Sequence, residues 1–214
     1  MILDVRPPKV FAPLWKSKRR YLCAWGGRGS GKSWDRATHM IVRHLTEPGL
    51  SSICLRDVQK SLDQSVFKLL VETTARLGVA EAIRPVESDR IIRTPGNGII
   101  AFNGMNEFNA ENIKSLEGFD IAWWEEAATA GQGPLDMLRP TLRKPGSQIW
   151  FTYNPRLRSD PVDVMMRQDP RFEDSRTVVE ANWRDNPFRG PELEEERLLD
   201  DAVQDARRRG SPLG

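Results

Sequence analysis

A glycine-rich stretch at residues 26–33 carries the clearest chemical signal in the sequence. Its residues, Gly-Gly-Arg-Gly-Ser-Gly-Lys-Ser, fit the phosphate-binding pattern G-x-x-x-x-G-K-[ST]. Glycine lets the backbone turn tightly enough for its N–H groups to surround a phosphate, and the N-terminus of a following helix favours anions. In this pattern Lys32 reaches the β- and γ-phosphates, and the Ser33 hydroxyl coordinates Mg²⁺. We therefore expect ATP to be held by Gly26, Gly27, Arg28, Gly29, Ser30, Gly31, Lys32 and Ser33.

Two adjacent carboxylates, Glu125 and Glu126, follow the apolar run at residues 121–124. An apolar strand that ends in acids is typical of the Walker B element of an ATPase, although its first acid is more often Asp. Consecutive strand residues point to opposite faces of a sheet, so the two acids should have different roles. We expect Glu125 to bind Mg²⁺ directly or through water, and Glu126 to orient or deprotonate the attacking water. The alternative is an acidic pair that is only solvated.

A further apolar run, residues 149–151, leads into Thr152 and Asn154. Ligands of open α/β folds bind at the carboxyl edge of the sheet, so a strand ending here could present Thr152 or Asn154 to the γ-phosphate. The alternative is a strand that simply stops at an Asn-Pro turn.

Arginines matter because charge on the transferred phosphoryl group needs a cation, from the same chain or from a neighbouring subunit. Arg28 lies inside the glycine-rich loop and is the candidate in the same chain. Arg139 and Arg143 are candidates to reach across a subunit interface. The alternative for each is a solvated surface role. Weaker candidates for nucleotide or DNA contact, with the same alternative, are Arg56, Lys60 and Lys114.

An aromatic ring among cations precedes the first apolar run. The segment contains Trp15, Lys16, Lys18, Arg19 and Arg20. Such a segment could stack an adenine or touch phosphate. The alternative is a packed N-terminal arm whose lysines are solvated.

The elements that must position these residues alternate along the chain. We predict strands at residues 21–25, 52–55, 120–124 and 148–151, and helices at residues 32–45 and 57–77. In the second helix, Ser61 and Gln64 form a possible capping box, and the predicted core positions are Val66, Leu69, Leu70, Thr73 and Leu77. This alternation predicts an α/β fold with a mainly parallel central sheet flanked by helices.

A turn cluster at residues 94–98 separates two further strand-like runs, residues 89–93 and 99–102. This arrangement predicts a β-hairpin inserted in the α/β framework. We expect residues 1–190 to form one nucleotide-binding domain and residues 191–214 to form a C-terminal helix and linker.

Composition excludes some classes and leaves others open. The 214 residues carry 32 Lys and Arg against 30 Asp and Glu, a net charge of +2, so bulk charge neither demands nor excludes nucleic acid. His39 and His44 lie far from both cysteines, which argues against a zinc site. The sequence lacks a signal-peptide pattern and a long apolar stretch, so we expect a cytoplasmic protein without a membrane partner.

Several segments together resemble the large subunits of tailed-phage terminases. They are residues 26–33, 55–61, 113–118, 124–127, 143–147, 152–155 and 181–187. The resemblance runs in order from about Phe11 to Arg197 and is close to the branch whose Walker B element has Glu-Glu.

This resemblance implies a P-loop ATPase of the additional-strand type. In that family a homo-oligomeric ring on the portal vertex drives double-stranded DNA into a procapsid, in the cytoplasm of the infected host. The implied partners are DNA, the portal protein and the small terminase subunit, with a monomer possible in isolation. Arg28 would sense the γ-phosphate, and residues 152–154 would couple hydrolysis to movement. The family also has an RNase H-like nuclease domain. We expect no nuclease activity here, because the chain stops before one.

Three rival functions remain. Another DNA-dependent ATPase or helicase-like motor would share the loop and the acids, but a chain of this length has no room for a second motor domain. A GTPase switch or small-molecule kinase would use the same loop, yet the sequence has no Asn-Lys-x-Asp segment for base recognition. A purely structural or binding role would leave both motifs idle, and nucleotide binding would separate it from the others.

Overall fold

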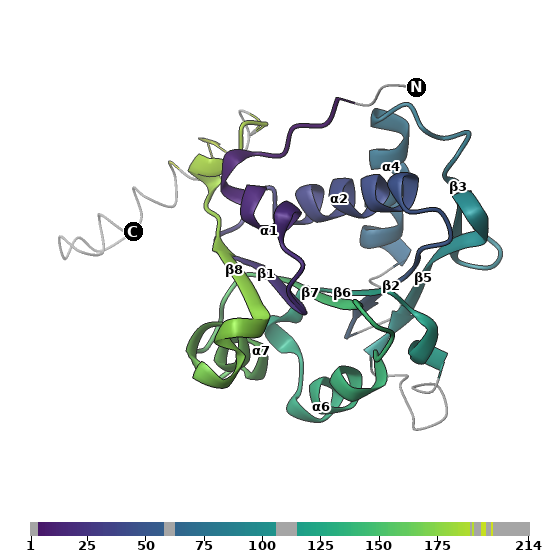
Figure 1. Cartoon of the computed structure of the whole chain (residues 1–214). Helices are drawn as coiled ribbons and strands as arrows, with labels where there is room; N and C mark the ends of the chain where they lie inside the picture. The colour runs from purple at the N-terminus through teal and green to yellow at the C-terminus, as the bar shows by residue number, and fades with distance from the viewer. Residues whose placement is uncertain are drawn as a thin grey trace.

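An eight-stranded sheet lies between two layers of helices in the computed structural model of the chain (Figure 1). The structure describes residues 4–57, 63–105 and 115–188, together with Gly190, Glu194, Glu195 and Leu198. The predicted α/β fold with a mainly parallel sheet is confirmed within this part of the chain.

The strand order is β3-β4-β5-β2-β6-β7-β1-β8. Their bounds are β1 Tyr21–Trp25, β2 Ser51–Arg56, β3 Arg84–Val86, β4 Ile91–Thr94, β5 Gly98–Gly104, β6 Ile121–Glu125, β7 Gln148–Tyr153 and β8 Arg176–Glu180. All neighbouring pairs from β5 to β8 are parallel, whereas β4 is antiparallel to both β3 and β5. Strand β1 therefore lies between two strands that come much later in the chain.

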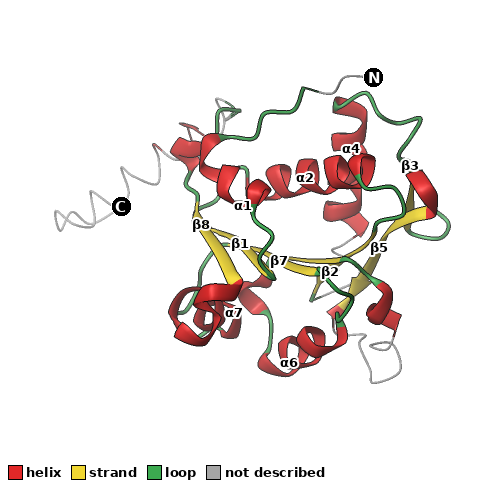
Figure 2. Ribbon diagram, viewed as in Figure 1, coloured by secondary structure: helices red, strands yellow, loops and turns green. Residues whose placement is uncertain are grey.

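The helices cover both faces of this sheet (Figure 2). On one face lie η1 Lys9–Phe11, α1 Ala12–Lys16, α2 Lys32–Thr46, the π-helical turn η2 Asp63–Phe67 and α4 Lys68–Arg76. On the other lie α6 Gln132–Thr141 and α7 Pro161–Asp163, which continues into the π-helical turn η7 Val164–Gln168. Short 3₁₀ turns are η3 Pro95–Asn97, η5 Ser115–Gly118, η6 Ala127–Thr129, η8 Pro170–Ser175 and η9 Trp183–Asp185.

Each face of the sheet has its own hydrophobic core. Trp123 and Trp150 are fully buried against the α2 layer, while Trp124 and Phe151 are fully buried against the α6 and α7 layer. Successive side chains of a strand point to opposite faces, so a strand buried on both sides must be apolar throughout. This explains why the runs that lead to the acids and to Asn154 have no polar alternation.

The predicted hairpin is confirmed, with η3 as its turn between β4 and β5. It is not a separate insertion, because β5 also pairs in parallel with β2. The hairpin and β3 instead extend one edge of the main sheet.

The predicted helix, from about residue 57 to residue 77, is confirmed from residue 63 to residue 76, and residues 58–62 lie outside the described residues. Asp57 is a non-helical bend after β2, and the described helical backbone runs from Asp63 through η2 into α4. Ser61 of the predicted capping box lies outside the described residues. The core prediction holds fully for Val66, Leu70 and Thr73, which are buried, while Leu69 and Leu77 are partly buried.

Most of residues 191–214 lies outside the described residues, so the predicted terminal helix and domain boundary stay predictions. Among the residues that are described, no helix is both long enough and apolar enough to cross a membrane.

Candidate nucleotide-binding site

The glycine-rich loop connects the end of β1 to the start of α2, which is the strand-loop-helix context that its pattern requires. Gly26, Gly29 and Gly31 have φ values of 135°, 69° and 81°. A Cβ atom on Gly26 would lie 2.1 Å from the carbonyl oxygen of Ala181, directly after β8. Glycine is therefore required at position 26 both for its backbone conformation and for space.

Lys32 lies at the centre of this loop. Its Nζ donates to the carbonyl oxygens of Gly26 at 3.1 Å and Gly27 at 2.7 Å, to Ser30 Oγ at 2.8 Å and to Asn154 Oδ1 at 2.9 Å. These are more acceptors than an ammonium has protons, so the amino group can exchange one partner for another. Burial lowers the pKa of Lys32 to about 8, against an opposing effect of the Glu125 charge. The loop thus holds a partly desolvated cation where its pattern predicts phosphate.

The two acids at the end of β6 have different surroundings, as predicted. The Glu125 side chain is 12% exposed, and its Oε1 accepts a hydrogen bond of 2.9 Å from Ser33 Oγ. The Glu126 side chain is 70% exposed, and the backbone of Glu126 is left-handed, with φ of 56°. Burial raises the pKa of Glu125, although the neighbouring Arg56 charge acts to lower it. One carboxylate thus faces Ser33, and the other faces solvent.

Arg56, at the end of β2, links both carboxylates. Its Nε donates to Glu125 Oε2 at 2.7 Å, and its Nη2 forms an ion pair with Glu126. Sequence reasoning placed Arg56 only among weak candidates for DNA or nucleotide contact, because no pattern shows which strand ends beside β6. Lys60 and Lys114, its fellow candidates, lie outside the described residues.

Of the two polar residues that follow β7, the structure brings one to the loop. Asn154 contacts Lys32, as described above. Thr152 is buried, and its Oγ1 accepts a hydrogen bond of 3.0 Å from the Trp123 indole in the layer beneath α2. Thr152 lies beside Glu125 in the strand register, so its backbone borders the site while its side chain faces the core.

Arg28 lies at the carboxyl ends of the strands, whereas Arg139 and Arg143 lie at their amino ends. The Arg28 side chain is exposed in the loop itself, at the carboxyl end of β1. The Arg139 carbonyl accepts a hydrogen bond of 3.1 Å from Arg20, which directly precedes β1. Arg143 forms an ion pair of 2.6 Å with Glu117. Neither Arg139 nor Arg143 reaches the loop of its own chain, so their action from a neighbouring subunit stays a prediction.

Trp15 packs against α2 instead of lining the loop. Its ring stacks on His39 with centroids 4.3 Å apart, and its indole N–H donates to Asp35 at 2.9 Å. Arg19 and Arg20 donate to backbone carbonyls. The packed-arm alternative is therefore the correct one for Trp15.

Asn186 was missed by residue-level reasoning, although it lies in one of the segments that carry the family resemblance. Its Nδ2 donates to the Gly29 carbonyl at 2.8 Å, and an added Cβ on Gly31 would lie 3.4 Å from its side chain. The segment after β8 thus braces the outside of the loop.

A cavity of about 310 Å³ opens beside the two acids. It is lined by Ser33, Arg56, Ser65, Val66, Lys68, Leu69, Glu72, Glu125 and Glu126. The cavity therefore joins Ser33 in the first turn of α2, the two acids and the start of α4 in one continuous space.

Comparison with known proteins agrees with this geometry. Residues 18–199 match a family model described as phage terminase large subunit. The PBSX phage terminase large subunit of Bacillus subtilis (strain 168) is 25% identical over 181 residues, which cover 78% of this chain and 40% of the relative.

Two solved structures share the fold. The large terminase of a thermophilic bacteriophage has a TM-score of 0.71 at 12% identity, over 90% of this chain and 50% of that one. That terminase has also been solved with ADP and with ATP-gamma-S. The large terminase ATPase domain of Thermus phage P74-26 has a TM-score of 0.65 at 17% identity, over 92% and 89% of the two chains. This chain thus spans half or less of the PBSX protein and of the thermophilic phage terminase.

Proposed function

The chain belongs to the phage terminase large subunit family, and we propose that it hydrolyses ATP to drive double-stranded DNA into a viral procapsid. The observation that carries the proposal is the meeting of Lys32, Ser33 and Glu125 at one edge of the sheet. A phosphate-binding lysine, a hydroxyl and a carboxylate are the parts that an NTPase of this loop type requires.

The residues present suit ATP with Mg²⁺. Ser33 and Glu125 contribute two oxygen donors within hydrogen-bonding distance of each other, and Mg²⁺ prefers oxygen donors completed by water and substrate phosphates. We assign Ser33 and Glu125 as the residues that hold the ion. Bound there, Mg²⁺ supplies positive charge to the phosphate oxygens.

The remaining roles follow from placement. Residues 26–33 surround the phosphates, and Lys32 exchanges its present acceptors for phosphate oxygens. Glu126, exposed beside the cavity, orients or deprotonates the attacking water. Arg28 and Asn154 contact the γ-phosphate from the two sides of Lys32. These assignments extend the exposure of Glu126 and the Lys32–Asn154 contact into a reaction.

Partners come with the family. Double-stranded DNA, the portal protein, the small terminase subunit and further copies of this chain in a ring are the proposed assembly, in the cytoplasm of the infected host. Residues 1–190 are the proposed motor domain. Arg139 or Arg143 would act on a neighbouring subunit's nucleotide within that ring.

The test is ATP turnover with Mg²⁺, with and without double-stranded DNA. We expect Lys32→Ala to reduce kcat/KM by at least about 100-fold, because it removes a charged donor from the phosphates. We expect Glu126→Gln to bind ATP but to hydrolyse it at least about 100-fold more slowly. The matched controls are Lys9→Ala and Glu173→Gln, which change exposed residues outside the site.

The outcomes separate the parts of the proposal. Normal hydrolysis by Glu126→Gln would show that another group activates the water. Hydrolysis that DNA does not stimulate would retain the ATPase and remove the main support for a packaging motor.

A further inference from the structure

The Arg56 guanidinium is bound by three side chains from two segments, the end of β6 and the turn η2. Besides Glu125 and Glu126, its Nη1 donates to Ser65 Oγ at 2.8 Å. The Arg56 side chain is only 9% exposed, so these contacts replace water. A planar arginine that binds two acids and a hydroxyl at once fixes their relative positions.

Both oxygens of Glu125 are already used by the protein's own groups. Ser33 donates to Oε1, and Arg56 donates to Oε2. A Mg²⁺-nucleotide that recruits Ser33 and Glu125 draws on the same carboxylate that holds Arg56. Its binding therefore weakens the contact between Arg56 and Glu125, since the positive charge of the ion competes with the guanidinium for the negative charge of one carboxylate.

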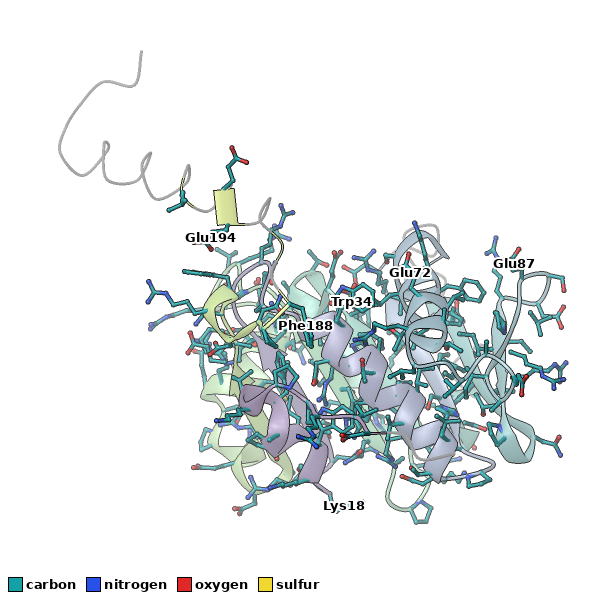
Figure 3. All side chains as sticks on the ribbon, turned by 90° about the horizontal axis from the view of Figure 1, so that it is seen from above. Lys18, Trp34, Glu72, Glu87, Phe188 and Glu194 are labelled. Atoms are coloured by element: carbon teal, nitrogen blue, oxygen red, sulfur yellow. The ribbon has the colours of Figure 1, made fainter. Side chains whose placement is uncertain are left out.

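Ser65 lies in η2, the π-helical turn at the start of α4. Such π-helical turns are rare overall, but those that occur are often found at functional sites. One turn of the helix there has a looser hydrogen-bond register. The neighbouring Val66 is buried in the core, and α4 packs against α2, the helix that begins at Lys32. Figure 3 shows α2 and α4 side by side, with Trp34 labelled on one and Glu72 on the other.

We propose that Arg56 and Ser65 form a relay that reports the nucleotide state of the site to α4. Arg56 is a positioning residue in this relay: it orients Glu126 and transmits a change at Glu125 to Ser65. When nucleotide binds, η2 shifts its hydrogen-bond register and the start of α4 moves with it. The relay rests on the proposed ATP binding, and it gives the chain a second route, besides Asn154 and β7, from the phosphates to the rest of the fold.

The test is amide hydrogen exchange across residues 63–76, with and without Mg²⁺ and ATP-gamma-S. It compares the native chain with Ser65→Ala and with Ser65→Thr, which keeps the hydroxyl. Calorimetry establishes that each protein is saturated with nucleotide. In the native chain we expect exchange in residues 63–70 to change at least about threefold on binding. Ser65→Ala should lose this change, and Ser65→Thr should retain it.

Two results would overturn the relay while leaving ATP binding intact. One is a native chain that binds the nucleotide with unchanged exchange at residues 63–70, a result that needs no variant to fold. The other is a Ser65→Ala chain that shows the full native change at saturation. A native chain that binds no nucleotide would overturn both the relay and the proposed function.

Discussion

Helix α2 carries two sets of polar side chains, and the two have different kinds of partner. The loop set, Lys32 and Ser33, lies in the first turn. The core set, Asp35, Arg36, His39 and His44, lies further along and faces the sheet and the N-terminal arm. Lys32 and the core set are buried, but only the loop set has partners that a ligand can replace.

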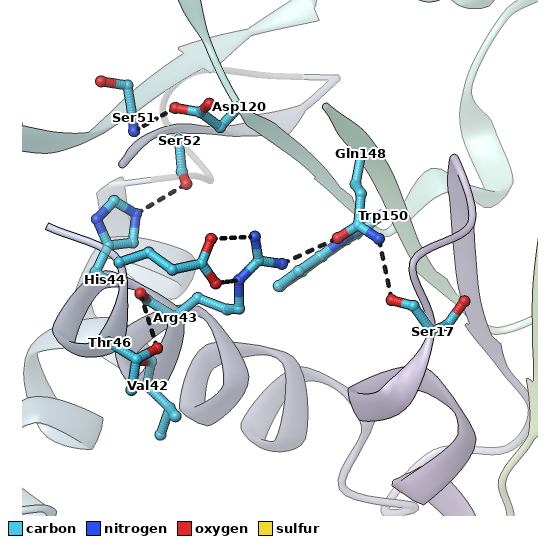
Figure 4. A network of polar contacts seen from close by, with 11 residues as sticks. Ser17, Val42, Arg43, His44, Thr46, Ser51, Ser52, Asp120, Gln148 and Trp150 are labelled. Carbon is cyan, nitrogen blue, oxygen red and sulfur yellow. Dashed lines mark hydrogen bonds and ion pairs between the residues drawn. The ribbon is translucent and has the colours of Figure 1, made fainter. Parts of the chain in front are cut away.

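In the core set the partners are fixed by secondary structure. Asp35 pairs with Arg36 at 2.5 Å, and both side chains are at most 2% exposed. His44 contacts Thr94 Oγ1 of β4 at 2.9 Å and Ser52 Oγ of β2 at 2.8 Å, the latter drawn in Figure 4. Lys32 instead contacts loop carbonyls and one amide. The difference indicates that burial alone does not mark a functional polar group, whereas exchangeable partners do.

Removing one partner of the buried ion pair in the core set should cause the largest loss of stability. Asp35→Ala leaves the Arg36 charge buried without its partner, and we expect a loss of about 3–5 kcal/mol in the free energy of unfolding. Urea denaturation measures it. The double variant Asp35→Leu, Arg36→Met, which removes both charges, should lose much less. An equal loss in both proteins would show that the pair stabilises by packing instead of by charge.

The pH dependence of stability should come from the core set as well. Burial lowers the pKa of His44 to about 3, with Arg43 adding to the effect and Asp120 opposing it. Between about pH 6.5 and about pH 3, therefore, His44 is protonated in the unfolded chain but neutral in the folded chain. Stability from this residue is complete above about pH 6.5 and falls by about 1.4 kcal/mol per pH unit toward pH 3.

His44→Gln should remove that slope while keeping one donor and one acceptor in the side chain. Urea denaturation of both proteins from about pH 7 to about pH 4 gives the difference, in which the carboxylates common to both cancel. Parallel curves would mean that His44 is protonated in the folded chain.

Asn186→Ala tests how far the loop depends on its contact with the segment after β8. It removes the brace on Gly29, so we expect about 1 kcal/mol less stability and several-fold weaker ATP binding. Calorimetry with ATP-gamma-S and urea denaturation measure the two effects. Asn103→Ala, in β5, is the control. Unchanged affinity would mean that the loop keeps its shape without this contact.

The smallest effect on folding should come from the most important loop residue. Lys32→Met removes a desolvated charge and keeps the length of the side chain, so we expect the free energy of unfolding to stay within about 0.5 kcal/mol of native, or to rise. ATP binding should nevertheless be lost. Lys9→Met controls for the loss of an exposed charge. A fall in stability above about 2 kcal/mol would place Lys32 with the core set.

Short sequence patterns predicted the structural features that are formed by neighbouring residues. The glycine spacing predicted the loop, and the turn at residues 94–98 predicted the hairpin, because these signals lie within a few residues of the structures that they specify. The exact start of the helix after β2 stays a prediction, since residues 58–62 lie outside the described residues.

Features that depend on distant strand pairing were beyond the sequence. Arg56 meets Glu125 only because β2 pairs with β6, and Asn186 meets Gly29 only because β8 pairs with β1. Arg139 likewise lies at the amino ends of the strands only because α6 returns its carbonyl to Arg20, which precedes β1. No single-sequence pattern contains that strand order.

The contact between Gly26 and Ala181 also has a consequence for synthesis of the chain. The phosphate loop precedes β7 and β8 in the chain by more than a hundred residues, although these two strands flank β1. A nascent chain therefore carries the loop for the whole interval before β7 and β8 are made, without the strands that shape it. Parallel pairings between such distant segments form slowly, so nucleotide can be captured only once nearly the whole described domain has emerged.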